Sequence, residues 1–151
     1  MDKIEVLKRS DLFRELDDEQ LALVAKIGTD QVFDAGAIIY KQGSIAELIY
    51  VIEEGLVGII LEVGPLAQRQ VQAAANFESF GWSAMMPPYT RTATVKALEK
   101  TKVTVLNGRE LTAFCTTYTE VGFKIMQAVA RVIAERLRQA YIQLLGVTDE
   151  D

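Results

Sequence analysis

The sequence contains no histidine and one cysteine, Cys115. Zinc sites made of imidazole and thiolate ligands and catalytic triads built around histidine are therefore excluded. One cysteine cannot form a disulfide within the chain, so we expect a cytoplasmic protein in which Cys115 is a small buried residue. Apolar runs such as Leu56 to Leu61 fall far short of the roughly 18 residues of a membrane-spanning helix, and we expect no membrane association.

Motifs for phosphate chemistry and an excess of positive charge are also missing. The chain has neither GxxxxGK nor GxGxxG, and no pair of carboxylates suited to glycoside chemistry, so we expect a protein that is not an enzyme. Its 16 basic residues face 21 acidic ones, giving a net charge of −5. The one modest basic cluster is Arg131, Arg136 and Arg138. This balance opposes nucleic-acid binding, and DNA is not an expected partner.

What is present fits one domain, residues 1–146, followed by an acidic tail at 147–151. Residues 4–28 predict two helices, the second opened by a capping box of Asp17 and Gln20 and stopped at Gly28. Residues 31–107 hold β-branched runs separated by turns, which predicts a mainly β sandwich, roll or barrel with flanking helices.

Residues 119–146 show the most regular periodicity, and Thr117 with Glu120 is expected to cap this helix. One heptad seam predicts a homodimer interface: Phe123, Met126, Ala130, Ile133, Leu137, Ala140 and Leu144. A second apolar row can face the domain's own core: Val121, Ile125, Val129 and Val132. The alternative is a helix that only packs on its own domain.

The segment FGWSAMMPPYTRTA, residues 80–93, contains a lone arginine. WSAMM can form one helical turn, which Pro87 and Pro88 end, and Arg91 is expected to begin a strand. A short helix with free N–H groups beside an arginine suits a single phosphate. The alternative is an ordinary solvated strand arginine.

The order of these features resembles the cyclic nucleotide-binding domain family, which includes catabolite activator proteins. The family's opening helix is similar to LFRELDDEQLALV, its first strands to FDAGAIIYKQG and its central hairpin to ELIYVIEEGLVGII. Its phosphate-binding cassette resembles residues 80–93. The resemblance implies a jelly-roll β-roll, a closing dimer helix and the following ligand-binding residues: Phe80, Gly81, Trp82, Ser83, Ala84, Arg91 and Thr92. By this resemblance, Gly81 lets the backbone approach the ligand, and Ser83 and Ala84 offer N–H groups. Arg91 clamps the cyclic phosphate, and Thr92 assists Arg91 in binding it.

Several positions depart from the family pattern. Trp82 stands where the family has a glutamate that accepts from the ribose hydroxyl, Ser44 replaces an aspartate and Phe77 a glycine. An indole N–H can only donate, so Trp82 cannot replace the carboxylate, and its bulk is expected to fill the ribose position. Glu78 matches a different family position and is no obvious substitute.

Two functions stay open. The first is a stand-alone sensor or regulatory module that binds cyclic AMP, cyclic GMP or another phosphate-bearing ligand. The second is a homodimeric interaction module without a ligand, with a filled pocket and Arg91 paired to a carboxylate. Only GVTDED follows Leu145, which leaves no room for a helix-turn-helix, so we expect no transcription regulator and an unidentified protein as the partner for output.

Overall fold

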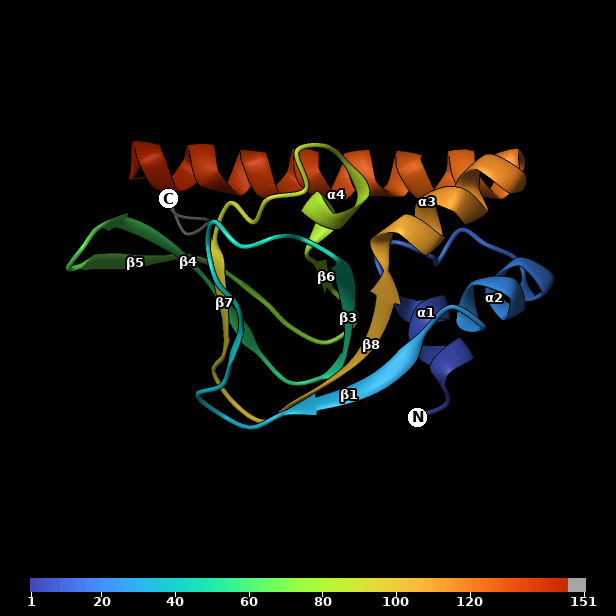
Figure 1. Ribbon diagram of the computed structural model, residues 1–151, viewed down its shortest axis with the longest axis horizontal. Coiled ribbons are helices and arrows are strands. Elements are labelled where there is room, and N and C mark those ends of the chain that lie inside the picture. Colours follow the sequence, from blue (N-terminus) through green and yellow to red (C-terminus); the bar gives the residue numbers. More distant parts are fainter. Residues whose placement is uncertain (147–151) are drawn as a thin grey trace.

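Two four-stranded antiparallel sheets form the body of the protein in the computed structural model, which describes residues 1–146. Four α-helices and one short 3₁₀ helix accompany the sheets in this part of the chain (Figure 1). The predicted mainly β roll with flanking helices is confirmed. The predicted acidic tail, residues 147–151, lies outside the described residues.

The two sheets have the strand orders β1-β8-β3-β6 and β2-β7-β4-β5. Strand β3, five of whose seven residues are buried, lies between β8 and β6 and carries the central residues of the roll. The strands have these bounds: β1 (Thr29–Phe33), β2 (Ile38–Tyr40), β3 (Leu48–Glu54), β4 (Val57–Gly64), β5 (Ala67–Ala74), β6 (Ser79–Phe80), β7 (Thr94–Ala97) and β8 (Thr101–Asn107).

Arg91 does not begin a strand, because β7 starts three residues later, at Thr94. The backbone of Arg91 is instead tied to the turn before β3: its N–H donates to the carbonyl of Ser44 at 2.8 Å, and its carbonyl accepts from the N–H of Gly43 at 2.8 Å. These two hydrogen bonds occupy the N–H and the carbonyl of Arg91, which in a strand would pair with a neighbouring strand. They also fix the position of the Arg91 backbone and hence of its side chain.

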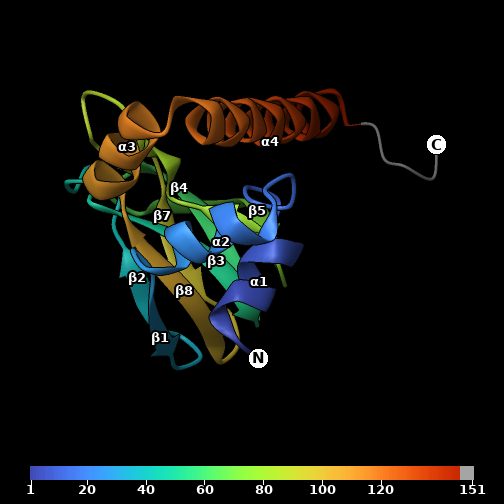
Figure 2. The ribbon, with the colours of Figure 1, turned by 90° about the vertical axis from the view of Figure 1, so that its right-hand side faces the viewer.

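The two N-terminal helices, α1 (Lys3–Arg9) and α2 (Asp18–Ala25), lie on one flank of the roll (Figure 2). The predicted capping box is present: the Asp17 carboxylate accepts from the Gln20 N–H at 2.9 Å, and the Gln20 side chain accepts from the Asp17 N–H at 3.0 Å. The prediction that Gly28 stops the helix was wrong. Helix α2 ends at Ala25, and Gly28 instead leaves room for the Thr104 methyl group, which a Cβ would meet at 3.0 Å.

Helix α3 (Gly108–Thr117) was not predicted. Asn107 caps it by accepting from the N–H groups of Arg109 and Glu110, and Cys115 lies half-buried on its inner side. Thr117 is its last residue and donates to the carbonyl of Ala113, so it cannot cap the next helix as predicted. The final helix, α4 (Thr119–Leu145), begins after Tyr118 without a side-chain cap.

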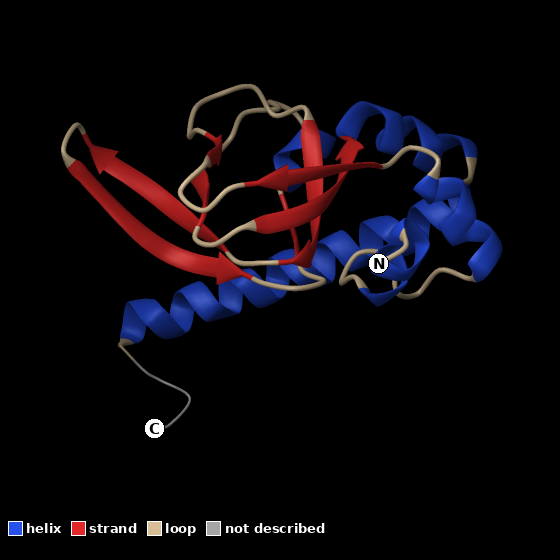
Figure 3. Ribbon diagram, turned by 90° about the horizontal axis from the view of Figure 1, so that it is seen from below, coloured by secondary structure: helices blue, strands red, loops and turns tan. Residues whose placement is uncertain are grey.

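Helix α4 runs along the whole molecule beside both sheets (Figures 1 and 3). Its first half belongs to the domain's own core, because Val121, Ile125 and Val129 are buried and Val132 packs against the same cluster. The large residues of the predicted seam are exposed instead: Phe123, Met126, Ile133, Leu137 and Leu144. Ala130 and Ala140 are exposed as well.

Candidate ligand site

The predicted cassette connects β6 to β7 and begins with a sharp turn. Gly81 has φ of 90°, in the left-handed region that glycine adopts without strain, and this turn leads into η1 (Trp82–Met85). A Cβ at position 81 would lie 3.0 Å from both Nη1 of Arg91 and the carbonyl oxygen of Leu48. The absence of a side chain at Gly81 therefore gives the arginine its room.

Arg91 is buried, with 4% of its surface exposed. Its Nη1 donates to the carbonyl oxygen of Gly81 at 2.9 Å, and its Nη2 donates to that of Leu48 at 2.6 Å. The centre of its guanidinium lies 3.8 Å from the centroid of the Tyr40 ring, a close cation–π contact. The arginine is thus held inside the protein and is not a solvated side chain.

The charge of Arg91 has no carboxylate partner within 4 Å among residues 1–146, unlike the internal ion pair expected for an interaction module without a ligand. Its neighbours are carbonyl oxygens and phenol rings, which compensate the charge only in part. Burial lowers the pKa of Arg91, while Tyr40 and Tyr50 oppose that change. Its Nε is buried and has no hydrogen-bond partner.

Aromatic rings fill the interior of the roll next to Arg91. Tyr50 and Phe80 stack with ring centroids 4.8 Å apart, and Tyr40 lies 6.0 and 6.2 Å from them. Phe80, predicted as a ligand contact, is 1% exposed and belongs to this core. Cavities of about 330 to 740 Å³ lie on the described residues, and Arg91 lines none of the five.

Burial raises the pKa of Tyr40 from 10.0 to about 12, although Arg91 and Arg136 act in the opposite direction. As pH rises, the unfolded chain therefore loses this phenol proton before the folded chain does. The stability gained by burying the neutral phenol is complete below about pH 10 and is lost as pH rises toward 12.

We therefore expect Tyr40→Phe to weaken the alkaline loss of stability. Between about pH 9 and 11.5, the wild type should lose about 2 kcal/mol of unfolding free energy more than the variant does. Urea titrations of both proteins at the two pH values measure this difference, and the variant serves as the control for every other group that titrates there. Equal losses would show that Tyr40 is not held neutral by burial.

Trp82 faces the helices rather than Arg91. Its Nε1 donates to Oγ of Ser79 at 3.0 Å, and its ring packs on the helical core cluster. The guanidinium of Arg136, from α4, lies 5.0 Å from the centroid of the ring. The filling role predicted for Trp82 therefore falls to Tyr40, the ring that covers Arg91.

The other predicted ligand contacts are less available than expected. Ala84 is 1% exposed and its N–H points back to the Gly81 carbonyl at 3.3 Å, while Ser83 is half-buried. Thr92 is exposed. Glu78 accepts from the N–H of Ala75 at 2.9 Å and lies 4.0 Å from Arg136, so its carboxylate belongs to the α4 side.

Two residues of this region were not predicted as part of the site, although Arg136 was noted as a member of the basic cluster. Tyr40 comes just before the KQG turn and gave no pattern to single it out. Arg136 gave one: it follows Val129 and Val132 at helical spacing, so it is a charged residue on the inner row of α4. In the structure Arg136 is 9% exposed, and its Nη2 donates to the Ser79 carbonyl at 3.0 Å.

Neither a metal site nor a membrane segment is found in the described part of the chain. No group of three or more potential ligand side chains converges among residues 1–146. Within the same range, no helix is both long and apolar enough to cross a membrane.

The model of the cyclic nucleotide-binding domain matches residues 30–118, which hold the roll, the cassette and α3. The chain belongs to the cyclic nucleotide-binding domain family. This match supports the fold, and its range includes the predicted cassette, but it leaves the occupant of the cassette open.

Relatives of this family show where such domains occur. A protein of Rhodopseudomonas palustris that is named as a potassium channel protein is 28% identical over 144 residues, covering 95% of this chain and 34% of its own length. A cAMP-dependent protein kinase regulatory subunit of Dictyostelium discoideum is 30% identical over 104 residues, covering 69% of this chain and 32% of its own. The chain thus spans about one third of the curated relatives it matches.

A crystal structure described as a cyclic nucleotide-binding protein of Geobacter metallireducens is similar over nearly its entire length. Its identity to this chain is 28%, and its TM-score is 0.79 over 91% of this chain and 99% of that one. This cyclic nucleotide-binding domain is therefore similar both to a segment of larger proteins and to a protein of about its own size.

Proposed function

We propose that this chain is a homodimeric regulatory module whose cassette is closed by backbone carbonyls and a side chain of its own and does not bind cyclic AMP or cyclic GMP tightly. The burial of Arg91 between two carbonyls and the Tyr40 ring carries this proposal. A ligand phosphate would have to displace two hydrogen bonds and a cation–π contact before the guanidinium could reach it. Dimerisation through α4 and an unidentified protein partner would provide the output.

Position 82 adds a second obstacle. The family's glutamate at this position accepts a hydrogen bond from the ribose, and Trp82 offers only a donor that is already bonded to Ser79. A hydrogen bond to a charged group contributes about 1.5 to 3 kcal/mol, so its loss should weaken binding by roughly ten- to a hundredfold. Both the phosphate and the sugar halves of a cyclic nucleotide thus lack their expected partners.

Calorimetric titration with cyclic AMP and cyclic GMP tests the proposal. We expect no binding, or dissociation constants weaker than about 100 μM, for the wild type. Trp82→Glu restores the missing carboxylate and serves as the second protein. It should still not reach submicromolar affinity, because Arg91 stays closed. Submicromolar binding of either nucleotide by the wild type would overturn the closed-cassette proposal.

One observation favours a second function, a sensor of an altered anionic ligand. The Nε of Arg91 is buried without an acceptor, and an unpaired buried donor costs free energy that an anion's oxygen would recover. In this case a phosphate-bearing compound without a ribose requirement replaces the two carbonyls at the guanidinium. Arg91→Ala should then abolish binding of that compound, and an unchanged affinity would assign Arg91 a structural role alone.

A further inference from the structure

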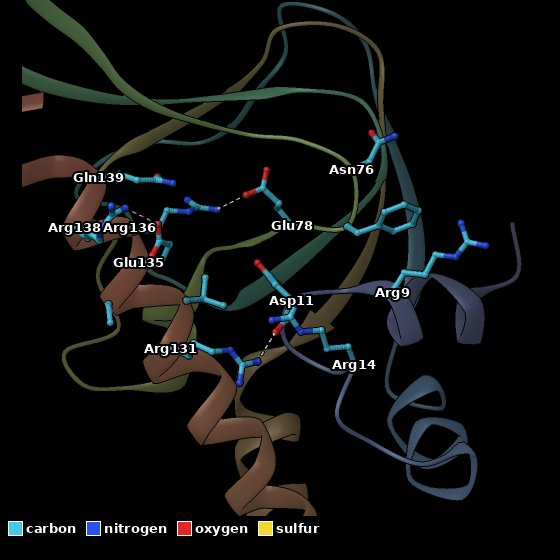
Figure 4. A pocket seen from close by; sticks show the side chains of 13 residues that line it. Arg9, Asp11, Arg14, Asn76, Glu78, Arg131, Glu135, Arg136, Arg138 and Gln139 are labelled. Atoms are coloured by element: carbon cyan, nitrogen blue, oxygen red, sulfur yellow. Dashed lines mark hydrogen bonds and ion pairs between the residues drawn. The ribbon is translucent and has the colours of Figure 1, made fainter. Parts of the chain in front are cut away.

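A cavity of about 740 Å³ lies outside the cassette, where three segments far apart in the sequence meet (Figure 4). Its walls come from the end of α1 and the connection after it, from the turn between β5 and β6, and from α4. This volume falls within the range of about 300 to 1,000 Å³ that is typical of small-molecule sites.

Five arginines line this cavity: Arg9, Arg14, Arg131, Arg136 and Arg138. Three carboxylates line it as well, Asp11, Glu78 and Glu135. The difference, five minus three, gives the lining a formal charge of +2 in a chain whose net charge is −5. Figure 4 shows Asp11 and Glu78 between the arginines of α4 on one side and Arg9 on the other. Positive charge is therefore concentrated around this cavity, while the protein as a whole is acidic.

Much of this positive charge is not committed to strong internal pairs. Arg131 is exposed and makes no ion pair with a carboxylate in residues 1–146; its Nη2 reaches only the Asp11 carbonyl, at 3.5 Å. Arg14 contacts only its neighbour Glu15, at 3.8 Å, with both side chains more than half exposed. Arg138 pairs with Glu135 at 3.4 Å and is 65% exposed. Exposed pairs of this kind are weak, so these guanidinium groups can turn to an incoming anion.

Arg136 provides the fixed part of the same wall. Its guanidinium is buried, bonded to the Ser79 carbonyl and lying against the Trp82 ring. Guanidinium groups bind phosphate oxygens through paired hydrogen bonds, and several of them around one cavity favour an anion with more than one negative charge. We propose that this arginine-lined cavity binds a small phosphate-bearing molecule.

The proposed site lies apart from Arg91 and from the dimer seam, and it adjoins the cassette where Arg136 lies against Trp82. Arg91 does not line the cavity. Arg138 directly follows the seam residue Leu137, and consecutive residues point about 100° apart around a helix. Arg131 likewise follows the seam residue Ala130, so a second copy packed on the seam would leave Arg131 and Arg138 on another side of the helix.

Calorimetry with inorganic pyrophosphate and 5′-AMP on the whole chain tests this site at about 100 mM salt, where general attraction is screened. We expect the wild type to bind at least one of the two with a dissociation constant below about 1 mM, and Arg131→Ala to weaken it at least roughly tenfold. Arg131 is exposed and weakly bonded, so this variant should fold, which circular dichroism checks. Arg109→Ala is the matched control, since Arg109 is exposed and lies outside the cavity.

Three results would overturn the proposal: neither probe binding below about 1 mM at this salt, equal loss of affinity in Arg109→Ala and Arg131→Ala, or loss in Arg91→Ala with Arg131→Ala unchanged. The last result would place the anion in the cassette and would support the second candidate function instead. Loss in Arg131→Ala with Arg91→Ala and Arg109→Ala unchanged supports the arginine-lined cavity, whatever the outcome of the cyclic nucleotide titrations.

Discussion

Replacing Arg136 by alanine is expected to lower the free energy of unfolding by about 3 kcal/mol. The change removes a charged, buried hydrogen bond to the Ser79 carbonyl and the contact with the Trp82 ring. It also removes the aliphatic part of a side chain that fills space between α4 and the roll. The ion pair with Glu78 adds little, because it is 4.0 Å long and the Glu78 side chain is half exposed.

Arg138→Ala is the matched control, two residues further along the same helix. Its guanidinium is 65% exposed and pairs only with Glu135. We expect this variant to stay within about 0.5 kcal/mol of the wild type in urea titrations. A loss of stability in Arg136→Ala no larger than in Arg138→Ala would show that α4 is not fixed to the roll through Arg136.

Replacing Ile133 by aspartate is expected to convert a dimer into a monomer. The seam of α4 exposes large apolar side chains at helical spacing, with Phe123 at 68%, Leu137 at 49% and Leu144 at 86% exposed. A second helix would cover them. A charge at position 133 would then be buried without a partner, at a cost of about 3 kcal/mol. Light scattering at a protein concentration of about 50 μM should give the mass of two chains for the wild type and of one chain for Ile133→Asp.

Gln139→Asp introduces the same charge on another side of the helix. Positions 133 and 139 point about 120° apart, so this variant should remain a dimer. If the wild type is already a monomer at these concentrations, the seam is not an interface between two copies. If both variants dissociate, the negative charge acts on α4 in general and not on the seam.

The sequence was sufficient for the roll and for helices α1, α2 and α4 because their patterns are local. β-branched runs between turns, the Asp17 and Gln20 capping box and the heptad spacing of α4 each occupy one short segment. Helix α3 was missed even though Asn107 and Glu110 stand three residues apart at its start, a spacing typical of a helix N-terminus. The prediction placed strands up to residue 107 and the final helix from residue 119, and it left the residues between them unassigned.

The state of Arg91 could not be read from the sequence, since it depends on contacts between distant segments. Leu48 is 43 residues away from Arg91 along the chain, and its carbonyl accepts from the guanidinium. Tyr40 comes from β2 and reaches Arg91 only after the roll has closed. The family pattern singled out the arginine, but it carried no information on whether the protein's own groups would occupy it.

Helix α4 is one continuous helix with two different environments. Up to Arg136 it contains buried residues, and Gln72 of β5 fixes that point by donating to the Arg136 carbonyl at 2.8 Å. None of the nine residues from Leu137 to Leu145 is buried, and at 1.5 Å per residue they extend about 13 Å beyond the anchor. Shortening the chain after Arg136 would leave the hydrophobic core of the domain complete while removing much of the surface available to another molecule. Burial of α4 against its own domain thus ends at Arg136, whereas the exposed row of the predicted seam runs from Phe123 to Leu144 along both halves. Mutations after Arg136 can therefore change the exposed surface of the helix without disturbing the core of the domain.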